Sequence, residues 1–364
     1  MKNITLLIDS SQFWEQFKKD TQTAEKNIYI QTLSFEGDSI GQNLHDELKK
    51  STATDIRIIS DTYINYIIND LFIFSPKNIF NTKLQAEVKA TKKLITSFKK
   101  NDIKVKILNP SGLPLIKMID CDHKKIIQID DKISYLGGIN FCEHNFLWHD
   151  LMIRIEDKDI ADYLKQDFLA TWEENRKSRS KKFKDLTIDL TDGPNNKNHF
   201  KKVINLINKA EKSIFVESPY ITFPYHQSLR KAKRRGVEIN IIAPEHNNKK
   251  TIGEYIKWES NRSGFNLYLY QNNMTHLKAL LIDEETLILG SSNFDYLSYQ
   301  ISKETILFIN NKNLINEFKE KVIKKDLANS VKYTGQKNNL TSWFWYLIMK
   351  LLGYLSVRLA RIKI

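Results

Sequence analysis

The chain has 364 residues, enough for two domains of ordinary size. It contains 56 Lys and Arg against 43 Asp and Glu, a formal net charge of +13, which favours a polyanionic partner, either nucleic acid or anionic lipid. A composition of 41% hydrophobic and 27% charged residues is that of a globular protein and excludes a disordered chain.

The N-terminus and the cysteines bear on cellular location. The apolar run that follows Met1 is too short for a secretory signal, so we expect no signal peptide. No stretch reaches the roughly 20 uninterrupted apolar residues that span a bilayer. The only cysteines are Cys121 and Cys142, a usage typical of a cytosolic protein, and we interpret them as buried thiols rather than as a disulfide or metal site.

Helix and strand patterns alternate along the chain and occur twice. The segment 24–32 matches 210–218 in sequence, and an amphipathic helical pattern precedes each segment. Alternating helices and strands predict an α/β fold with a helix-covered sheet in each half. The predicted elements after these segments are helices at about 40–50 and 226–235 and strands at 56–59, 103–108, 237–242 and 265–270.

Two segments interrupt the repeat. Residues around 62–100 are a surplus of the first half, and they either cover the active site or pack on the sheet. Residues 176–184 carry six cations and precede a turn-rich stretch, which is typical of a linker. We therefore predict a first domain at 1–175, a basic linker at 176–196 and a second domain at 197–335.

The last 24 residues, 341–364, have the pattern of a basic amphipathic helix. Such a helix lies in the headgroup plane of a membrane without crossing it, and the alternative is a helix packed on the protein core. Its apolar face and its cationic face are formed, respectively, by Trp345, Ile348, Leu352, Leu355, Leu359 and Ile362 and by Lys350, Arg358 and Arg361.

One motif occurs in both halves. From each histidine, a Lys lies at +2, an Asp at +7, a Gly at +14 and an Asn at +17, a repetition far beyond chance matching. The first copy contains His123, Lys125, Asp130, Gly137, Gly138 and Asn140, and the second contains His276, Lys278, Asp283, Gly290, Ser291 and Asn293.

These residue types predict an anion-binding site. In a strand, the His and Lys two residues apart lie on the same side, and the Asn adds an amide donor. If the two copies face each other, their Lys and Asn side chains stabilise the charge of a phosphodiester transition state. One imidazole then attacks phosphorus and the other protonates the leaving oxygen. A metal site is the disfavoured alternative, because each Lys ammonium repels a cation beside the His.

The pattern H-x-K-x4-D-x6-G-[GS]-x-N in two copies is similar to that of the phospholipase D superfamily. Within it, the chain most resembles bacterial cardiolipin synthases of the B type, through Glu143-His144 after the first motif, the run Gly290–Ser298 and the Trp-rich C-terminus. The resemblance implies two α/β repeats, each a mixed sheet flanked by helices, packed with pseudo-twofold symmetry around one shared active site.

The resemblance also implies a ping-pong mechanism through a phosphatidyl-histidine, without metal or cofactor. It assigns the nucleophile to His123 and the general acid–base role to His276. The acids at +27 and +28, Asp150 and Glu304, orient the imidazoles, whereas Asp130 and Asp283 are structural. One departure is Leu277 between His276 and Lys278, where smaller residues are common; it bears on the acceptor side of the pocket.

The predicted activity is therefore transfer of a phosphatidyl group from phosphatidylglycerol to a second lipid alcohol, with release of glycerol. Phosphatidylglycerol is the expected donor and acceptor, an anionic membrane is the expected partner, and the cytoplasmic face of the cell membrane is the expected location. The alternatives are a phospholipase D that uses water as acceptor, a nuclease of the same superfamily, and a non-catalytic lipid-binding relative. We expect no nucleic-acid partner, and the sequence predicts no oligomeric state.

Overall fold

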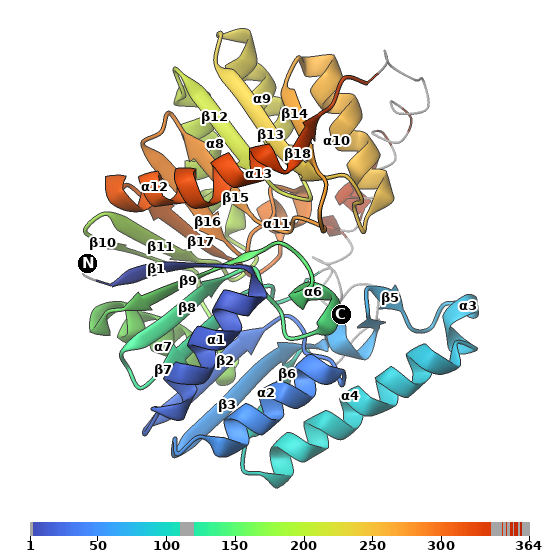
Figure 1. The fold of residues 1–364 in the computed structure, drawn as a ribbon, viewed down its shortest axis with the longest axis vertical. Helices are drawn as coiled ribbons and strands as arrows, with labels where there is room; N and C mark the ends of the chain where they lie inside the picture. Colours follow the sequence, from blue (N-terminus) through green and yellow to red (C-terminus); the bar gives the residue numbers. More distant parts are fainter. Residues whose placement is uncertain are drawn as a thin grey trace. The chain divides into compact units, whose positions relative to one another are not determined.

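A computed structural model gives the fold of the chain. It describes residues 3–109 and 120–335 and, in the C-terminal segment, residues 344, 347, 350, 351, 353–355, 357 and 358. The chain forms two compact units, Met1–Lys177 and Ser178–Ile364, each with a sheet and surrounding helices (Figure 1).

The first unit is built on a mixed sheet of seven strands. In spatial order these are β1 (Ile4–Ile8), β9 (Leu151–Glu156), β8 (Ile133–Gly137), β7 (Ile126–Ile129), β2 (Asn27–Thr32), β3 (Asp55–Asp61) and β6 (Lys104–Leu108). The other elements are α1 (Asp9–Gln22), α2 (Ser39–Lys50), η1 (Thr62–Asn65), β4 (Ile67–Ile68), β5 (Leu71–Phe72), α3 (Pro76–Ile79), α4 (Thr82–Lys100), α6 (Glu143–Phe146) and α7 (Lys158–Trp172).

The second unit is built on a mixed sheet of nine strands. In spatial order these are β10 (Arg179–Phe183), β11 (Leu186–Leu190), β17 (Thr305–Ile309), β16 (Thr286–Gly290), β15 (Ala279–Ile282), β12 (Ser213–Glu217), β13 (Glu238–Pro244), β14 (Asn266–Tyr270) and β18 (Ser330–Lys332). The helices are α8 (Asn196–Lys209), α9 (Tyr225–Arg234), α10 (Lys250–Ser263), α11 (Tyr296–Gln300), α12 (Lys312–Phe318), the π-helical turn η2 (Lys319–Ile323) and α13 (Lys324–Ala328).

The two sheets repeat one topology, as the sequence predicts. The order β1-β9-β8-β7-β2-β3-β6 in the first sheet corresponds to β11-β17-β16-β15-β12-β13-β14 in the second. In both, a central strand pairs in parallel with the next strand along the chain and antiparallel with the strand that follows the histidine. The α/β fold with two mixed-sheet repeats is thereby confirmed.

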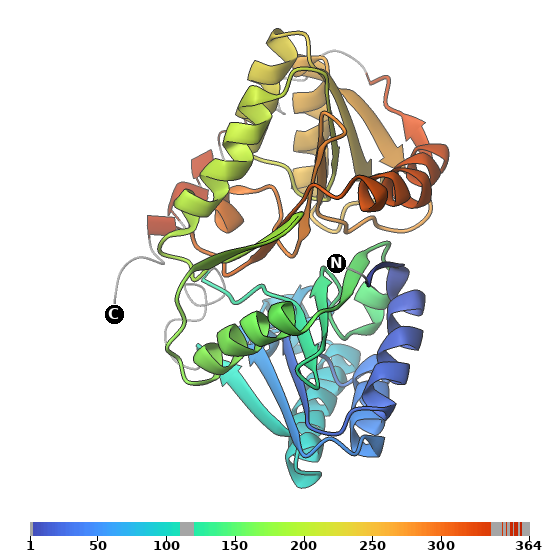
Figure 2. The ribbon, with the colours of Figure 1, turned by 90° about the vertical axis from the view of Figure 1, so that its left-hand side faces the viewer.

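Helices cover both faces of the first sheet, and the side chains on both sides of its central strand β2 are therefore buried. Ile28 and Ile30 of β2 pack in a core with α1, α2 and α4, whereas the intervening Tyr29 stacks on Phe168 of α7 with ring centroids 4.7 Å apart. Figure 2 shows α7 on one face of this sheet and α1 and α2 on the opposite face. Adjacent residues of a strand point to opposite faces, so β2 supplies both cores.

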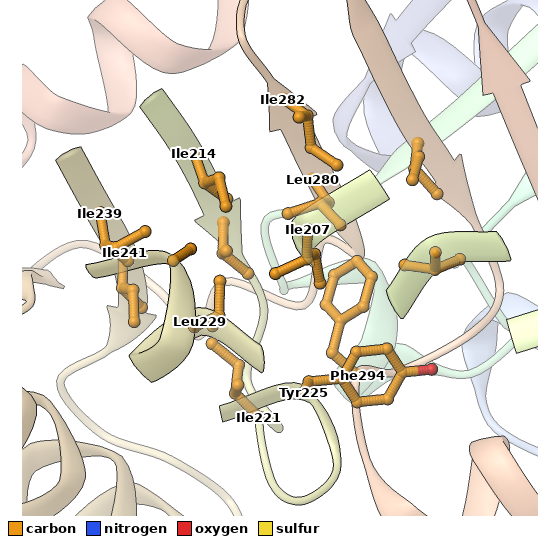
Figure 3. Packing of buried hydrophobic residues seen from close by; sticks show 14 of the residues in the cluster. Ile207, Ile214, Ile221, Tyr225, Leu229, Ile239, Ile241, Leu280, Ile282 and Phe294 are labelled. Atoms are coloured by element: carbon orange, nitrogen blue, oxygen red, sulfur yellow. The ribbon is translucent and has the colours of Figure 1, made fainter. Parts of the chain in front are cut away.

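The core of the second unit lies between its sheet and α8, α9 and α10. Ile214 of β12, Ile239 of β13 and Leu280 of β15 are buried and contact Ile207 and Leu229 from the helices (Figure 3). These positions alternate along each strand with residues of the opposite face. The predicted strands at 237–242 and 265–270 therefore each supply one face to this core.

The segment predicted as a basic linker, 176–196, contains two strands of the second sheet. The division between the units falls after Lys177, and β10 and β11 follow it and pair antiparallel. β10 lies at the edge of the sheet, where lysines discourage pairing with other chains. The cationic residues that led to the prediction of a linker thus lie in part on an edge strand.

The surplus around 62–100 folds as η1, the β4–β5 pair, α3 and α4. Leu94 and Phe98 of α4 join the core of the first unit, so the C-terminal part of the surplus packs on the sheet. Among the described residues, no helix is long and apolar enough to cross a membrane.

We predict that Ile214→Ala lowers the free energy of unfolding by about 2–5 kcal/mol, because it leaves a cavity in a fully buried region. Urea denaturation followed by circular dichroism measures this loss. Val331→Ala is the matched control: its side chain is exposed, and a change of less than about 0.5 kcal/mol is expected. Equal effects of the two substitutions would contradict the assignment of Ile214 to the core.

Candidate active site

The His–Lys pair of each motif lies directly before a central strand. His123 and Lys125 precede β7, and His276 and Lys278 precede β15. β7 and β15 are each flanked by the strand of the upstream repeat segment and by the strand that leads to the Gly motif. Each sheet therefore brings the three repeated sequence segments together at one place.

In the second unit, His276 and Lys278 are in direct contact. Lys278 Nζ lies 2.7 Å from His276 Nδ1, both side chains are buried, and the ammonium also donates to the His276 carbonyl oxygen. Tyr220 lies edge-on to the His276 ring, with centroids 6.4 Å apart. A Lys ammonium is only a donor, so Nδ1 of His276 accepts the hydrogen bond and the proton of the neutral ring is on Nε2.

In the first unit, Lys125 is buried and donates to the carbonyl oxygen of His123, with an Nζ–O distance of 3.0 Å. The intervening Lys124 forms an ion pair with Asp167 of α7 at 2.5 Å, and both side chains are 1% exposed. Leu277, at the same position in the second copy, is also buried. The residue between His and Lys is therefore buried in both copies. Lys124 is held in the interior by its ion pair with Asp167, and Leu277 is held there by apolar packing.

The two motif aspartates accept hydrogen bonds from the backbone of the upstream repeat segments. Asp130 accepts hydrogen bonds from the backbone N–H groups of Glu25, Lys26 and Asn27 at 2.7–3.1 Å. Asp283 accepts the equivalent three from Glu211, Lys212 and Ser213 at 2.8–3.0 Å. Burial opposes ionisation of Asp283, but these backbone hydrogen bonds outweigh it and lower its pKa.

The Gly motifs come close to the two acids at +27 and +28. A Cβ on Gly138 would meet the Asp150 carboxylate oxygens at 2.3 and 2.5 Å, so only glycine fits there. Glu304 is fully buried and accepts hydrogen bonds from the hydroxyls of Ser291, at 2.5 Å, and Ser298, at 2.8 Å. Each acid is therefore packed directly against the loop that leads to the motif asparagine.

The motif asparagines are buried at the end of these loops. Asn140 donates to Asn145 at 2.7 Å and accepts from Thr32 at 3.2 Å, which fixes the amide plane and leaves a second N–H. Asn293 has an amide oxygen without a hydrogen-bond partner among the described residues. A buried polar atom of this kind is costly unless a ligand or water completes it.

The structure adds a pair of buried hydrogen bonds that the sequence analysis missed. Gln31 at the end of β2 donates to Asp122 at 2.9 Å, and Thr275 donates to Glu217 at the end of β12 at 2.5 Å. The positions correspond, since Asp122 and Thr275 directly precede the histidines. In the first unit the acid precedes the histidine, whereas in the second unit the acid is on the neighbouring strand, as Glu217. An alignment of the two repeats that includes the residue before each histidine would have shown this exchange, because it matches Asp122 with Thr275 and Gln31 with Glu217.

Two overlapping groups near the first motif have the residue types of a metal site. The ligand atoms of Glu36, Cys142 and His144 lie within 4.8 Å of one another, as do those of Glu36, Asp38 and Glu87. Burial raises the pKa of Glu36 and raises that of the Cys142 thiol well above its usual range. Burial thus favours the protonated form of both groups, which opposes metal binding because metal ligands are deprotonated.

Comparison with known families identifies the fold and the two motifs. The model of the family described as "Cardiolipin synthase, PLD-like domain" matches residues 17–172 and 203–325, which is more than half of the chain. The protein belongs to this phospholipase D-like family. It is accordingly an enzyme of the phospholipase D superfamily, in the class that transfers phosphatidyl groups, with phospholipids as its substrates.

Individual relatives agree with this assignment. Cardiolipin synthase 1 of Staphylococcus epidermidis is 26% identical, over 90% of this chain and 68% of the relative. Cardiolipin synthase of Clostridium perfringens is 25% identical, over 91% of this chain and 72% of the relative. Phosphatidylserine synthase of Haemophilus influenzae shares the fold, with a TM-score of 0.68, 15% identity and coverage of 99% of this chain and 95% of that chain.

We predict that Asp283→Asn destabilises the second unit by about 1–2 kcal/mol at pH 7, because an amide accepts backbone hydrogen bonds more weakly than a carboxylate. The folded-state pKa of Asp283 is lowered, so its contribution is present above the unfolded-state pKa of about 3.9 and is lost as pH falls through the folded value. Denaturation of both proteins between pH 7 and pH 3 measures the difference. A difference that stays constant as pH falls would contradict the role of the charged carboxylate.

Proposed function

We propose that the enzyme makes cardiolipin by transfer of a phosphatidyl group from one phosphatidylglycerol to another, with release of glycerol. The observation that carries the proposal is the buried contact of Lys278 with His276 Nδ1, in a chain whose family and relatives are cardiolipin synthases. That contact supports a distinct task for each histidine, as a two-step transfer requires.

In the first step, Nε2 of His123 attacks phosphorus and forms a P–N bond, while the bond from phosphorus to the glycerol oxygen breaks. His276 supplies the proton that the departing oxygen needs. The contact of Lys278 Nζ with Nδ1 supports this role because it fixes the ring and leaves Nε2 as the nitrogen that exchanges the proton. Nε2 donates from the imidazolium ion, and the ring then returns to its neutral form. Both histidines must reach one phosphate, the arrangement that the repeated motif predicts.

In the second step, His276 takes the proton from a hydroxyl of the acceptor lipid. That oxygen attacks phosphorus, the P–N bond breaks and His123 is free again. Lys125, Lys278, Asn140 and Asn293 bind the non-bridging oxygens and stabilise the charge that develops in both transition states. The burial of Lys125 and of Lys278, each within its own unit, supports this role.

Asp150 and Glu304 act as positioning residues in this proposal. The close approach of Asp150 to Gly138 and the hydrogen bonds of Glu304 to Ser291 and Ser298 support it, because they fix the loops on which the asparagines depend. We assign them the further task of orienting the imidazoles. Through this task Asp150 sets the tautomer of His123, whereas the tautomer of His276 follows from its contact with Lys278.

We assign membrane attachment to the C-terminal segment, and we place the attached protein at the cytoplasmic face of the membrane. The described residues there are helical, and Phe344, Leu347, Leu351, Tyr354 and Leu355 are exposed. Lys350 and Arg358 are exposed as well, and each cation near an anionic leaflet contributes about 1 kcal/mol. Of the predicted apolar face, only Leu355 lies within the described residues. Val357 is buried, so one side of the helix packs on protein.

The test of the reaction incubates the purified protein with phosphatidylglycerol vesicles and a chelator and then separates the lipids. We expect cardiolipin and glycerol from the wild type and, from His123→Ala and His276→Ala, a rate lowered by at least about 10³-fold. Phosphatidic acid as the main product would replace the transferase with a phospholipase D. Near-normal turnover by either variant would contradict the two-histidine mechanism.

We predict that deletion of residues 341–364 lowers the fraction of protein that sediments with anionic vesicles at least fivefold. None of the described residues of this segment belongs to the two sheet cores, so the thermal unfolding of the remaining chain should be largely preserved. Leu351→Asp with Leu355→Asp tests the same surface without deletion, because both side chains are exposed. Unchanged sedimentation of both proteins would show that the helix belongs to the protein core.

A further inference from the structure

Besides the exposed apolar residues of the C-terminal segment, the first unit has an exposed apolar surface of its own. It lies in the segment 62–100, whose role the sequence left open. Leu71, Phe74, Ile79 and Phe80 are exposed, Phe74 by 52% and Phe80 by 84%. We name these four residues the apolar tip. They follow one another within β5, α3 and the loops beside them, and no other ten-residue stretch among the fully described ranges 3–109 and 120–335 exposes as many large apolar side chains.

The apolar tip is held outward by a small core of its own. Ile68, Ile73 and Leu84 are buried together and form a cluster separate from the main core of the unit. Asn78 donates to the Phe72 carbonyl oxygen at 2.8 Å, and the Ile73 N–H donates to the Tyr66 carbonyl oxygen at 2.9 Å. Apolar residues of this segment therefore divide into an inner set that packs and an outer set that remains in solvent.

The base of the tip is tied to the loop that carries the first Gly motif. The Asn69 N–H donates to Glu36 Oε1 at 3.0 Å, and the Glu36 N–H donates to the carbonyl oxygen of Phe141, the residue after Asn140. His144 Nε2 lies 3.9 Å from a carboxylate oxygen of Asp70. The tip is thus anchored at the edge of the sheet where the candidate catalytic residues of this unit lie.

The charge around the tip is positive. Between Leu71 and Lys83 the ionisable side chains are Lys77 and Lys83, with no Asp or Glu. The helix that follows, α4, contains six lysines against one glutamate, and Figure 1 shows it running from α3 back along the unit. The acid next to the tip, Asp70, lies at its base beside His144. Aromatic and aliphatic side chains next to lysines are the composition that inserts into the headgroup region of an anionic bilayer.

We propose that the apolar tip is a membrane-insertion site that places the edge of the first sheet, with its motif, at an anionic lipid bilayer. The inference rests on the proposed function in one respect, since a lipid substrate gives the enzyme a reason to hold this edge at the bilayer. Phe80 and Ile79 enter the acyl boundary, while Lys77 and Lys83 remain with the phosphates. The bilayer is thereby contacted independently of the C-terminal helix, and two linked contacts multiply in their effect on binding.

The experiment compares full-length wild type with the double variant Ile79→Asp/Phe80→Asp in sedimentation with vesicles of equal phosphatidylglycerol and phosphatidylcholine. We expect the partition coefficient of the double variant to fall at least tenfold. Val331→Asp is the matched control, because Val331 is 59% exposed on the edge strand β18, outside the tip, and should bind as the wild type does. Phe80→Leu, which keeps the apolar character, should retain most of the binding.

Vesicle binding by the double variant within twofold of the wild type would overturn the proposal. So would a loss of self-association on sedimentation velocity with unchanged vesicle binding, which would make the tip a surface for a second copy of the chain. Thermal unfolding establishes that each variant folds. Phe80→Asp alone, at the most exposed side chain of the tip, replaces the double variant if the latter unfolds.

A second readout separates this inference from the proposed function. On monomeric short-chain phosphatidylglycerol the double variant should turn over as the wild type does, whereas on vesicles its rate should fall with its binding. Equal losses on both substrates would assign the tip a role in folding or chemistry and overturn the proposal. A wild type that produces no cardiolipin but loses vesicle binding on Ile79→Asp/Phe80→Asp would refute the proposed function and retain the membrane-insertion site.

Discussion

The structure of each half depends on one carboxylate that accepts three backbone N–H groups. Asp130 does so at the start of β2, and Asp283 does so at the start of β12. The strand that follows each His–Lys pair, β7 or β15, is thereby fixed in register with β2 or β12. The position of the His–Lys pair at the other end of that strand is fixed with it. This interaction also explains why the upstream segments 24–32 and 210–218 repeat together with the motifs: each supplies the amides that its aspartate needs.

A rigid strand pairing allows the chemistry to be placed on loops. The loops that carry Asn140 and Asn293 each pack against a buried acid of their own unit, and Gly138 lets its backbone approach Asp150 closely. The cost of burying the two acids and Asn140 is offset by hydrogen bonds or close packing with neighbouring polar groups. The Asn293 amide oxygen has no hydrogen-bond partner among the described residues, and such an acceptor is completed by a donor, for example a water or a substrate hydroxyl.

Much of this arrangement follows from the sequence, and the reasons are physical. Buried strands with helices between them have periodic apolar patterns, and a repeated motif predicts a repeated topology, so the α/β fold and its occurrence in two halves were predictable. β10 was not, because Lys181 and Lys182 on an exposed edge strand give the charge density of a linker. The small core of Ile68, Ile73 and Leu84 was not predictable either, since three residues in short elements produce no period.

The exchanged acids of the two halves have a consequence for recombination between them. Gln31 pairs with Asp122 in one half, and Glu217 pairs with Thr275 in the other. A graft of the first motif onto β12 would set Asp122 against Glu217, two buried carboxylates whose repulsion and desolvation are costly. The reciprocal graft sets Gln31 against Thr275 and keeps a hydrogen bond. This contact therefore tolerates an exchange in one direction only, and β12 with Glu217 has to be kept together with Thr275.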